Sequence, residues 1–106
     1  MLVSEILAIK GKVLFTISPN KHVAEAVEIM NEQDVGSLVV FSRGEMVGML
    51  TFREVLQGVK RAGSDWQALA IDDVMIRNPQ VASPSMEMDE LRRMMVEHHQ
   101  RYLPVM

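Results

Sequence analysis

The chain repeats itself, and this constrains its fold more than any other feature. When the sequence is shifted by 65 positions, seven residues are identical among the 23 aligned pairs over residues 18–40, without a gap. Self-similarity of this kind indicates one structural unit that occurs twice. We therefore expect a first repeat over 1–61, a linker over 62–70 and a second repeat over 71–106. The identical pairs are Ser18/Ser83, Pro19/Pro84, Glu25/Glu90, Met30/Met95, Glu32/Glu97, Leu38/Leu103 and Val40/Val105.

The first repeat has a clear pattern of apolar residues. Alternation and β-branched residues predict strands, and apolar positions spaced three or four apart predict helices. For the helix over 52–61 this spacing predicts that Val55, Leu56 and Val59 face inward. The order is strand-helix-strand-strand-helix, which gives a mixed α/β domain. The expected elements are a strand over 13–17, a helix over 20–34, strands over 36–41 and 46–50 around a turn at 42–45, and helices over 52–61 and 66–75.

The second repeat is shorter than the first. It has an expected strand over 80–82, a helix over 86–98 and the start of a strand over 102–106. It lacks the hairpin partner and the final helix of the first repeat. A terminal strand without its neighbour would be an exposed sheet edge, so we expect the natural protein to continue for about 35 residues.

Composition excludes several classes of protein. The absence of Cys excludes a disulfide framework and a thiolate zinc site, and a net charge of −3 argues against general binding of nucleic acid. The longest apolar run is only Leu38–Phe41, so no segment can span a membrane and we expect a cytoplasmic protein. His98 and His99 lack a third ligand at suitable spacing, so we expect no metal site. No catalytic triad, Walker loop or dinucleotide-binding glycine motif is present, so we expect no enzyme.

The repeat pattern resembles a pair of cystathionine-β-synthase (CBS) domains, the tandem regulatory module, in its small stand-alone bacterial form. This resemblance implies two repeats packed with pseudo-twofold symmetry, the second one incomplete. It also implies homodimers and binding of AMP, ATP, NAD(H) or S-adenosylmethionine in clefts between the repeats. The segments that carry the resemblance are residues 16–19, 35–40, 48–54, 73–75, 78–79 and 101–105.

Three residues where a strand passes into a helix could hold a ribose phosphate. Thr51 precedes a helix N-terminus, whose unpaired N–H groups favour phosphate, and Arg53 adds a cation suited to phosphate oxygens. Glu54 supplies a carboxylate for ribose hydroxyls, at a position where the family usually has Asp. The same Thr51-x-x-Glu54 spacing is a capping box, in which each side chain satisfies a backbone donor of the other residue. Both interpretations stay open at this point.

The family arrangement implies which other residues would surround the ligand. The motif of one repeat faces the start of the other repeat, so Tyr102 would lie near the base and Arg77 or Arg101 near the phosphate. The nucleotide site would thus add Met75, Ile76, Arg77, Arg101, Tyr102, Leu103 and Pro104 to the motif. A possible second site would use Lys10, Gly11, Lys12, Gly36, Ser37 and Leu38.

The resulting hypothesis is a regulatory module that binds an adenosine-containing ligand and signals energy or cofactor state to another protein. Glu54 would repel a 2′-phosphate, which favours NADH over NADPH. The alternative is a dimerisation or protein-interaction module without a ligand. Glu54 in place of Asp favours that alternative, whereas Arg53 and the basic stretch 10–12 favour a ligand.

Overall fold

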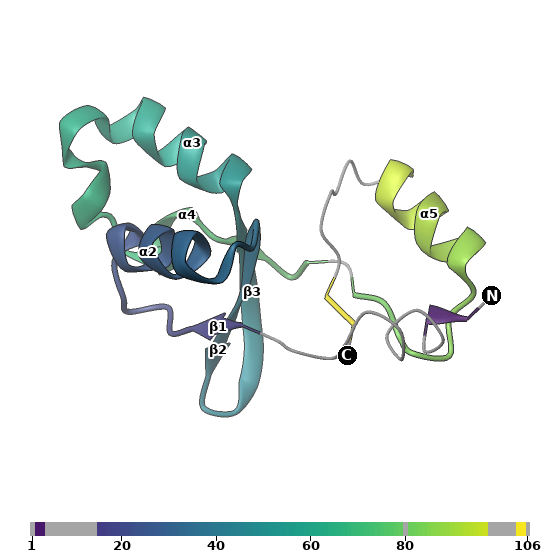
Figure 1. Cartoon of the computed structure of the whole chain (residues 1–106). Coiled ribbons are helices and arrows are strands. Elements are labelled where there is room, and N and C mark those ends of the chain that lie inside the picture. Colours follow the sequence, from purple (N-terminus) through teal and green to yellow (C-terminus); the bar gives the residue numbers. More distant parts are fainter. Residues whose placement is uncertain (1, 4–14, 80, 98–103, 106) are drawn as a thin grey trace. The chain divides into compact units, whose positions relative to one another are not determined.

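The computed structural model describes residues 2–3, 15–79, 81–97 and 104–105. The chain divides into two compact units, which we describe separately (Figure 1). The larger unit is Leu14–Asn78, and the smaller unit combines Met1–Val13 with Pro79–Met106. The larger unit therefore extends beyond the end expected for the first repeat, and the repeat boundaries themselves stay a prediction.

A four-stranded sheet organises the larger unit, in the order β1-β2-β3-β4. β1 runs parallel to β2, which forms an antiparallel hairpin with β3, and β3 is antiparallel to β4. A parallel neighbour needs a crossover connection, and the helix that follows β1 supplies it. The strands are β1 (Thr16–Ile17), β2 (Ser37–Ser42), β3 (Glu45–Thr51) and β4 (Ile76–Arg77).

The hairpin turn is tighter than the sequence pattern predicts. β2 continues through Ser42 and β3 begins at Glu45, so only Arg43 and Gly44 form the turn. Both have positive φ angles, 54° and 77°. Positive φ at both central residues is required by the type I′ turn, whose twist matches that of the strands it joins.

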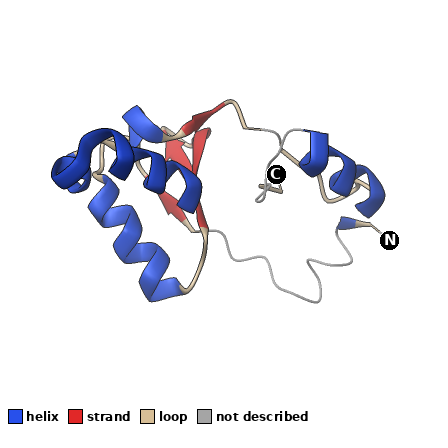
Figure 2. Ribbon diagram, turned by 90° about the horizontal axis from the view of Figure 1, so that it is seen from above, coloured by secondary structure: helices blue, strands red, loops and turns tan. Residues whose placement is uncertain are grey.

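The helices of this unit lie together beside the sheet (Figures 1 and 2). They are α2 (Val23–Gln33), α3 (Phe52–Ala62) and the short α4 (Ile71–Val74). The core joins them to the strands through ten buried residues: Ile17, Val23, Ala26, Met30, Leu38, Val40, Leu50, Val55, Ile71 and Met75. The expected mixed α/β fold is therefore confirmed.

The segment expected to be a linker has a structure of its own. Residues Gly63–Ala68 form a 3-10 helix, η1, and Trp66 and Leu69 pack against the core. Hydrogen bonds fix the end of this segment, because the N–H of Val23 donates to the carbonyl of Leu69 over 2.8 Å. The helical segment expected over 66–75 is thus a 3-10 helix and one turn of α-helix.

The expected orientation of α3 is wrong. Leu56 is 69% exposed and Val59 is 37% exposed, whereas Val55 is buried as expected. Gly58 explains the difference, because a Cβ there would lie 3.2 Å from Leu69 Cδ1. The helix turns this glycine inward to approach Leu69 closely, which leaves Leu56 and Val59 on its outer side.

The smaller unit is built around α5 (Met88–Glu97). Single β-bridges join Leu2 to Glu87 and Ala82 to Val105. The strands expected over 80–82 and 102–106 fall partly outside the described residues, as does residue 98 at the end of the expected helix. Among the residues that the structure describes, no helix has the length and apolar character needed to cross a membrane.

Candidate functional site

The junction of β3 and α3 has no intervening loop, because Thr51 ends the strand and also caps the helix. The Thr51 hydroxyl oxygen accepts a hydrogen bond from the N–H of Arg53 over 3.2 Å. Oε1 of Glu54 accepts hydrogen bonds from the N–H and the hydroxyl of Thr51, over 2.9 Å and 2.5 Å. The capping box allowed by the sequence is therefore present. Thr51 and Glu54 are the two buried polar residues in the described part of the chain.

The first turn of α3 is closed by these bonds. The N–H of Phe52 donates to the carbonyl of Gly36 over 3.2 Å, and that of Arg53 is held by Thr51. The first N–H groups of a helix attract phosphate when they are unpaired. Here they are already satisfied, so the helix terminus offers a phosphate less than the sequence pattern indicates.

The side chain of Arg53 is the group that the cap leaves available. Arg53 is exposed, and within the part of the chain that the structure describes its guanidinium makes no ion pair. A guanidinium can bind two phosphate or carboxylate oxygens at once. Arg53 therefore presents a cation directly beside the capping box.

Two residues expected at the second site lie beside the first motif. Ser37 pairs with Thr51 across β2 and β3, and the carbonyl of Gly36 accepts from the N–H of Phe52. Leu38, in contrast, is 1% exposed and belongs to the core. Gly36, Ser37, Thr51, Arg53 and Glu54 thus form one group at one end of the sheet, which we call the Thr51 end.

The residues expected around the ligand have differing environments. Met75 is buried in the core, and Ile76 pairs with Met49 in the sheet. Arg77 forms an ion pair of 3.0 Å with Asp72 and also donates to the carbonyl of Asp72 over 2.8 Å. Arg77 is therefore engaged by an acidic neighbour, although its side chain remains largely exposed.

The remaining candidates lie elsewhere or outside the described residues. Pro104 belongs to the smaller unit, where its carbonyl accepts from the N–H of Ala82 over 2.8 Å. Lys10, Gly11, Lys12, Arg101, Tyr102 and Leu103 lie outside the described residues. Among the described residues, no group of three or more His, Cys, Asp or Glu side chains could hold a metal ion.

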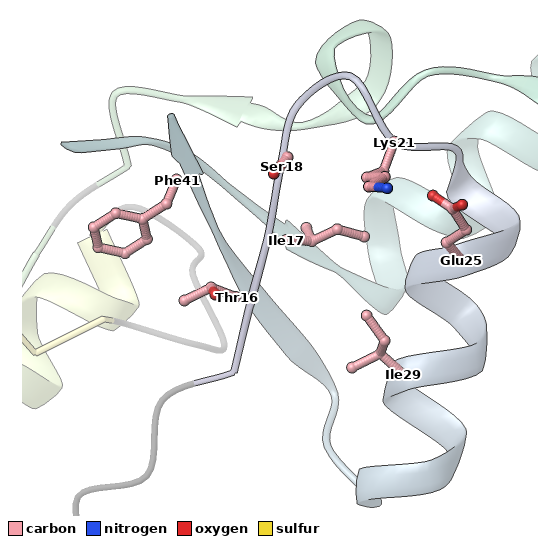
Figure 3. Close-up of a pocket in the computed structure, with 7 residues that line it drawn as sticks. All are labelled: Thr16, Ile17, Ser18, Lys21, Glu25, Ile29 and Phe41. Atoms are coloured by element: carbon pink, nitrogen blue, oxygen red, sulfur yellow. The ribbon is translucent and has the colours of Figure 1, made fainter. Parts of the chain in front are cut away.

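A pocket of about 340 Å³ lies beside β1, away from the Thr51 end (Figure 3). Its position differs because Thr51 pairs with Ser37 at the start of β2, whereas Phe41 lies near the end of that strand. Sequence reasoning missed it, since the lining residues come from a strand, a turn, a helix and the hairpin. They are Thr16, Ile17, Ser18, Lys21, Glu25, Ile29 and Phe41.

Comparison with protein families gives one result for both repeats. The family model of the CBS domain matches residues 3–61 and 71–106. The CBS domain-containing protein YhcV of Bacillus subtilis (strain 168) is 31% identical over 90 residues, which are 85% of this chain and 64% of YhcV. An inosine-5′-monophosphate dehydrogenase of Nitrosopumilus maritimus (strain SCM1) is 30% identical over 96% of this chain and 21% of that enzyme.

Solved structures are similar over most of the chain. A CBS-domain protein from Burkholderia ambifaria MC40-6 has a TM-score of 0.93 and 28% identity, over 100% of this chain and 80% of that one. CBSX2, solved in complex with AMP, has a TM-score of 0.72 and 25% identity, over 88% of this chain and 72% of CBSX2. The CBS domain pair of MJ0100 was solved with 5-methylthioadenosine and S-adenosyl-L-methionine. It has a TM-score of 0.85 and 23% identity, over 99% of this chain and 79% of the MJ0100 chain.

Proposed function

This chain belongs to the CBS domain family and is a regulatory module of that family, and we propose that it binds an adenosine-containing nucleotide at the Thr51 end. The ligand would report energy or cofactor state to another protein. A bound ligand can shift a conformational equilibrium only as far as it binds the two states differently. The regulated protein would therefore be one whose contact with this module differs between those states.

The exposed guanidinium of Arg53 is the observation that carries the proposal. Arg53 lies two residues after Thr51 and beside Glu54, so a cation and a carboxylate flank one helix start. Such a pair suits a ribose phosphate, because the phosphate is an anion and the ribose hydroxyls are donors. The roles expected for Arg77, Arg101 and Tyr102, as phosphate and base contacts, remain part of the proposal.

The ligands of the similar structures support the adenosine class. CBSX2 was solved with AMP, and the MJ0100 pair with 5-methylthioadenosine and S-adenosyl-L-methionine. Adenosine is the chemical part that these molecules share. We favour AMP, ATP or NADH for this chain, since Arg53 gives a phosphate-bearing ligand an additional contact. Glu54 would repel a 2′-phosphate, which disfavours NADPH.

Binding requires an exchange at Glu54. In the structure its Oε1 is occupied by the N–H and hydroxyl of Thr51. Ribose hydroxyls would have to replace these donors or use the remaining acceptor capacity of the carboxylate. The capping box therefore lowers the affinity for the ligand, because Thr51 and the ribose compete for the Glu54 carboxylate. Ligand binding would in turn loosen the first turn of α3.

A homodimer is the expected assembly, and α3 has a surface suited to it. Phe52 is 51% exposed, Leu56 69% and Val59 37%. The spacing of four and three residues places them on one side of the helix. Exposed apolar clusters of this kind mark interaction surfaces, and most soluble oligomers are symmetric homodimers. We therefore propose this α3 face as the dimer contact.

The second candidate is a dimerisation module without a ligand. Two observations favour it, namely the engagement of Glu54 by Thr51 and the satisfied N–H groups of Phe52 and Arg53. A site of that kind is stable without any ligand. The exposed Arg53 is the feature that this alternative leaves without a role.

Calorimetric titration separates the two candidates. The 106-residue chain is titrated with AMP, ATP, NADH and S-adenosylmethionine, and the Arg53→Ala variant is titrated in parallel. We expect at least one ligand to bind and Arg53→Ala to weaken it about tenfold, the usual effect of losing a charged hydrogen-bond partner. Arg43→Ala, in the hairpin turn, is the matched control and leaves the affinity unchanged. No heat from any ligand on folded protein would favour the dimerisation module.

A further inference from the structure

The pocket beside β1 is lined by two side chains of opposite charge and by aliphatic side chains. Lys21 and Glu25 face one another, and Ile17 and Ile29 lie below them on the same side of β1 (Figure 3). Glu25 and Ile29 are four residues apart on α2, which places them on one face of the helix. The pocket thus combines a cation, an anion and aliphatic surface within about 340 Å³.

Lys21 and Glu25 do not form an ion pair with each other. Among the described residues the ion pairs are Arg77–Asp72 and Arg92–Asp89, and none joins Lys21 to Glu25. Glu25 is partly engaged, because its Oε2 accepts from the N–H of His22 over 3.1 Å. A carboxylate has about four acceptor positions, so most of its capacity remains.

The edge of β1 adds backbone groups to the same pocket. β1 is the first strand of the sheet, and the N–H of Val39 donates to the carbonyl of Phe15 over 3.0 Å. Since Thr16 is the residue paired with Val39, its own N–H and carbonyl point away from β2. Among the strands of the described ranges none pairs with this side of β1, and Thr16 itself lines the pocket, so a backbone donor and a backbone acceptor lie beside Lys21 and Glu25.

We propose that this pocket binds a free α-amino acid with an aliphatic side chain. The Lys21 ammonium pairs with the ligand carboxylate, and Glu25 with the Thr16 carbonyl holds the ligand ammonium. The aliphatic side chain lies against Ile17 and Ile29. A zwitterion matches a cation and an anion that flank one opening, whereas a nucleotide would bring excess negative charge toward Glu25. The volume lies in the range of small-molecule sites.

This site is separate from the proposed nucleotide site. Phe41 lies four residues beyond Ser37 along β2, a distance of about 13 Å in a strand, and Ser37 pairs with Thr51. The inference does not depend on nucleotide binding. An amino acid signal and a nucleotide signal would reach the module at opposite ends of one sheet.

Amide NMR spectra of the 106-residue chain test the proposal with L-leucine as the probe. We expect L-leucine to shift the amide signals of Thr16, Lys21 and Glu25 in a saturable way. 4-Methylpentanoate lacks the ammonium and 3-methylbutylamine lacks the carboxylate, so each binds about tenfold more weakly or less. Equal binding of either analogue, or no shift with L-leucine, would overturn the proposal.

Matched variants locate the binding. Lys21→Gln and Glu25→Gln each weaken L-leucine about tenfold, and the glutamine keeps the capping bond to His22. Glu28→Gln, an exposed change on α2 outside the pocket, and Arg53→Ala leave the affinity unchanged. Unaltered affinity in both pocket variants would contradict the site. Binding of N-acetyl-leucine amide in place of L-leucine would instead indicate an extended peptide added to the β1 edge.

Discussion

Glu54 folds back onto Thr51, whose N–H and hydroxyl both donate to one oxygen of its carboxylate. These two hydrogen bonds stabilise the start of α3 without a ligand, and they hold the carboxylate where the proposed ribose contact would be. Stability and nucleotide binding therefore compete for the same atom. Substitutions at residue 54 should separate the two roles.

Glu54→Asp should strengthen nucleotide binding while weakening the fold. The shorter side chain reaches Thr51 poorly, so we expect the free energy of unfolding to fall by about 0.5–1 kcal/mol. The carboxylate of Asp at position 54 is then free to bind the ribose without displacing Thr51, so the affinity for AMP should rise several-fold. Urea denaturation and calorimetry with AMP measure the two effects. Glu54→Gln is the control, because it keeps the capping box but loses the charge, and should bind AMP more weakly. If all three proteins bind AMP equally, Glu54 does not touch the ligand.

Gly48 is required for β4 to pair with β3. A Cβ at this position would lie 2.6 Å from the carbonyl oxygen of Ile76 and 2.7 Å from Sδ of Met75. The methionine can move, but the backbone carbonyl cannot move without losing the pairing. We expect Gly48→Ala to lower the free energy of unfolding by about 1–3 kcal/mol in urea denaturation.

Gly58→Ala is the matched control for Gly48→Ala. Its Cβ would meet Leu69 Cδ1 at 3.2 Å, the far end of a flexible side chain. Alanine is also about 1 kcal/mol better than glycine within a helix. The two terms nearly cancel, so stability should stay close to that of the unaltered protein. Equal losses from both substitutions would contradict the role assigned to Gly48.

Local sequence patterns predict the longer helices and strands. The short strand β4 and the orientation of α3 depend instead on contacts between residues far apart in the sequence. α2, β2 and β3 have enough apolar periodicity to be found from sequence. β4 was missed because its two residues form a strand only through the space that Gly48 leaves. Leu56 was placed inside because periodicity counts apolar residues and gives no weight to Gly58.

The candidate site was predictable in part. The spacing from Thr51 to Glu54 identified the strand-to-helix junction, since a capping box depends only on local sequence. The sequence could not show that Ser37 lies beside Thr51, because this neighbour is fixed by the hairpin register. That register is set by the tight turn at Arg43 and Gly44 together with a one-residue register shift between Val40 and Phe41.

Leu56→Glu should convert a dimer into a monomer. The substitution places a charge at the centre of the α3 face, where dimerisation would bury it without a partner. Sedimentation equilibrium is expected to give a monomer mass for Leu56→Glu and a dimer mass for the unaltered chain. Gln57→Glu adds the same charge to the neighbouring exposed position and should leave the dimer intact. A dimer that persists in Leu56→Glu would exclude α3 as the contact.

Arg43→Asn should stabilise the hairpin. Arg43 has a φ of 54°, a region that asparagine tolerates better than arginine. We expect the free energy of unfolding to rise by about 0.5 kcal/mol, the lower end of the range for such turn optimisation. Thermal unfolding would show this as a higher midpoint. A lower midpoint would mean that the Arg43 side chain stabilises the protein in another way.

Amide NMR with AMP tests the central claim most directly, because it reports both binding and its location. Our account predicts saturable shifts at Thr51, Arg53 and Glu54, with smaller shifts at Gly36 and Ser37, and about tenfold weaker binding in Arg53→Ala. It also predicts unchanged signals at Lys21 and Glu25. Saturable binding that leaves the Thr51 end unaltered, or no binding by folded protein, would contradict a nucleotide site at this junction.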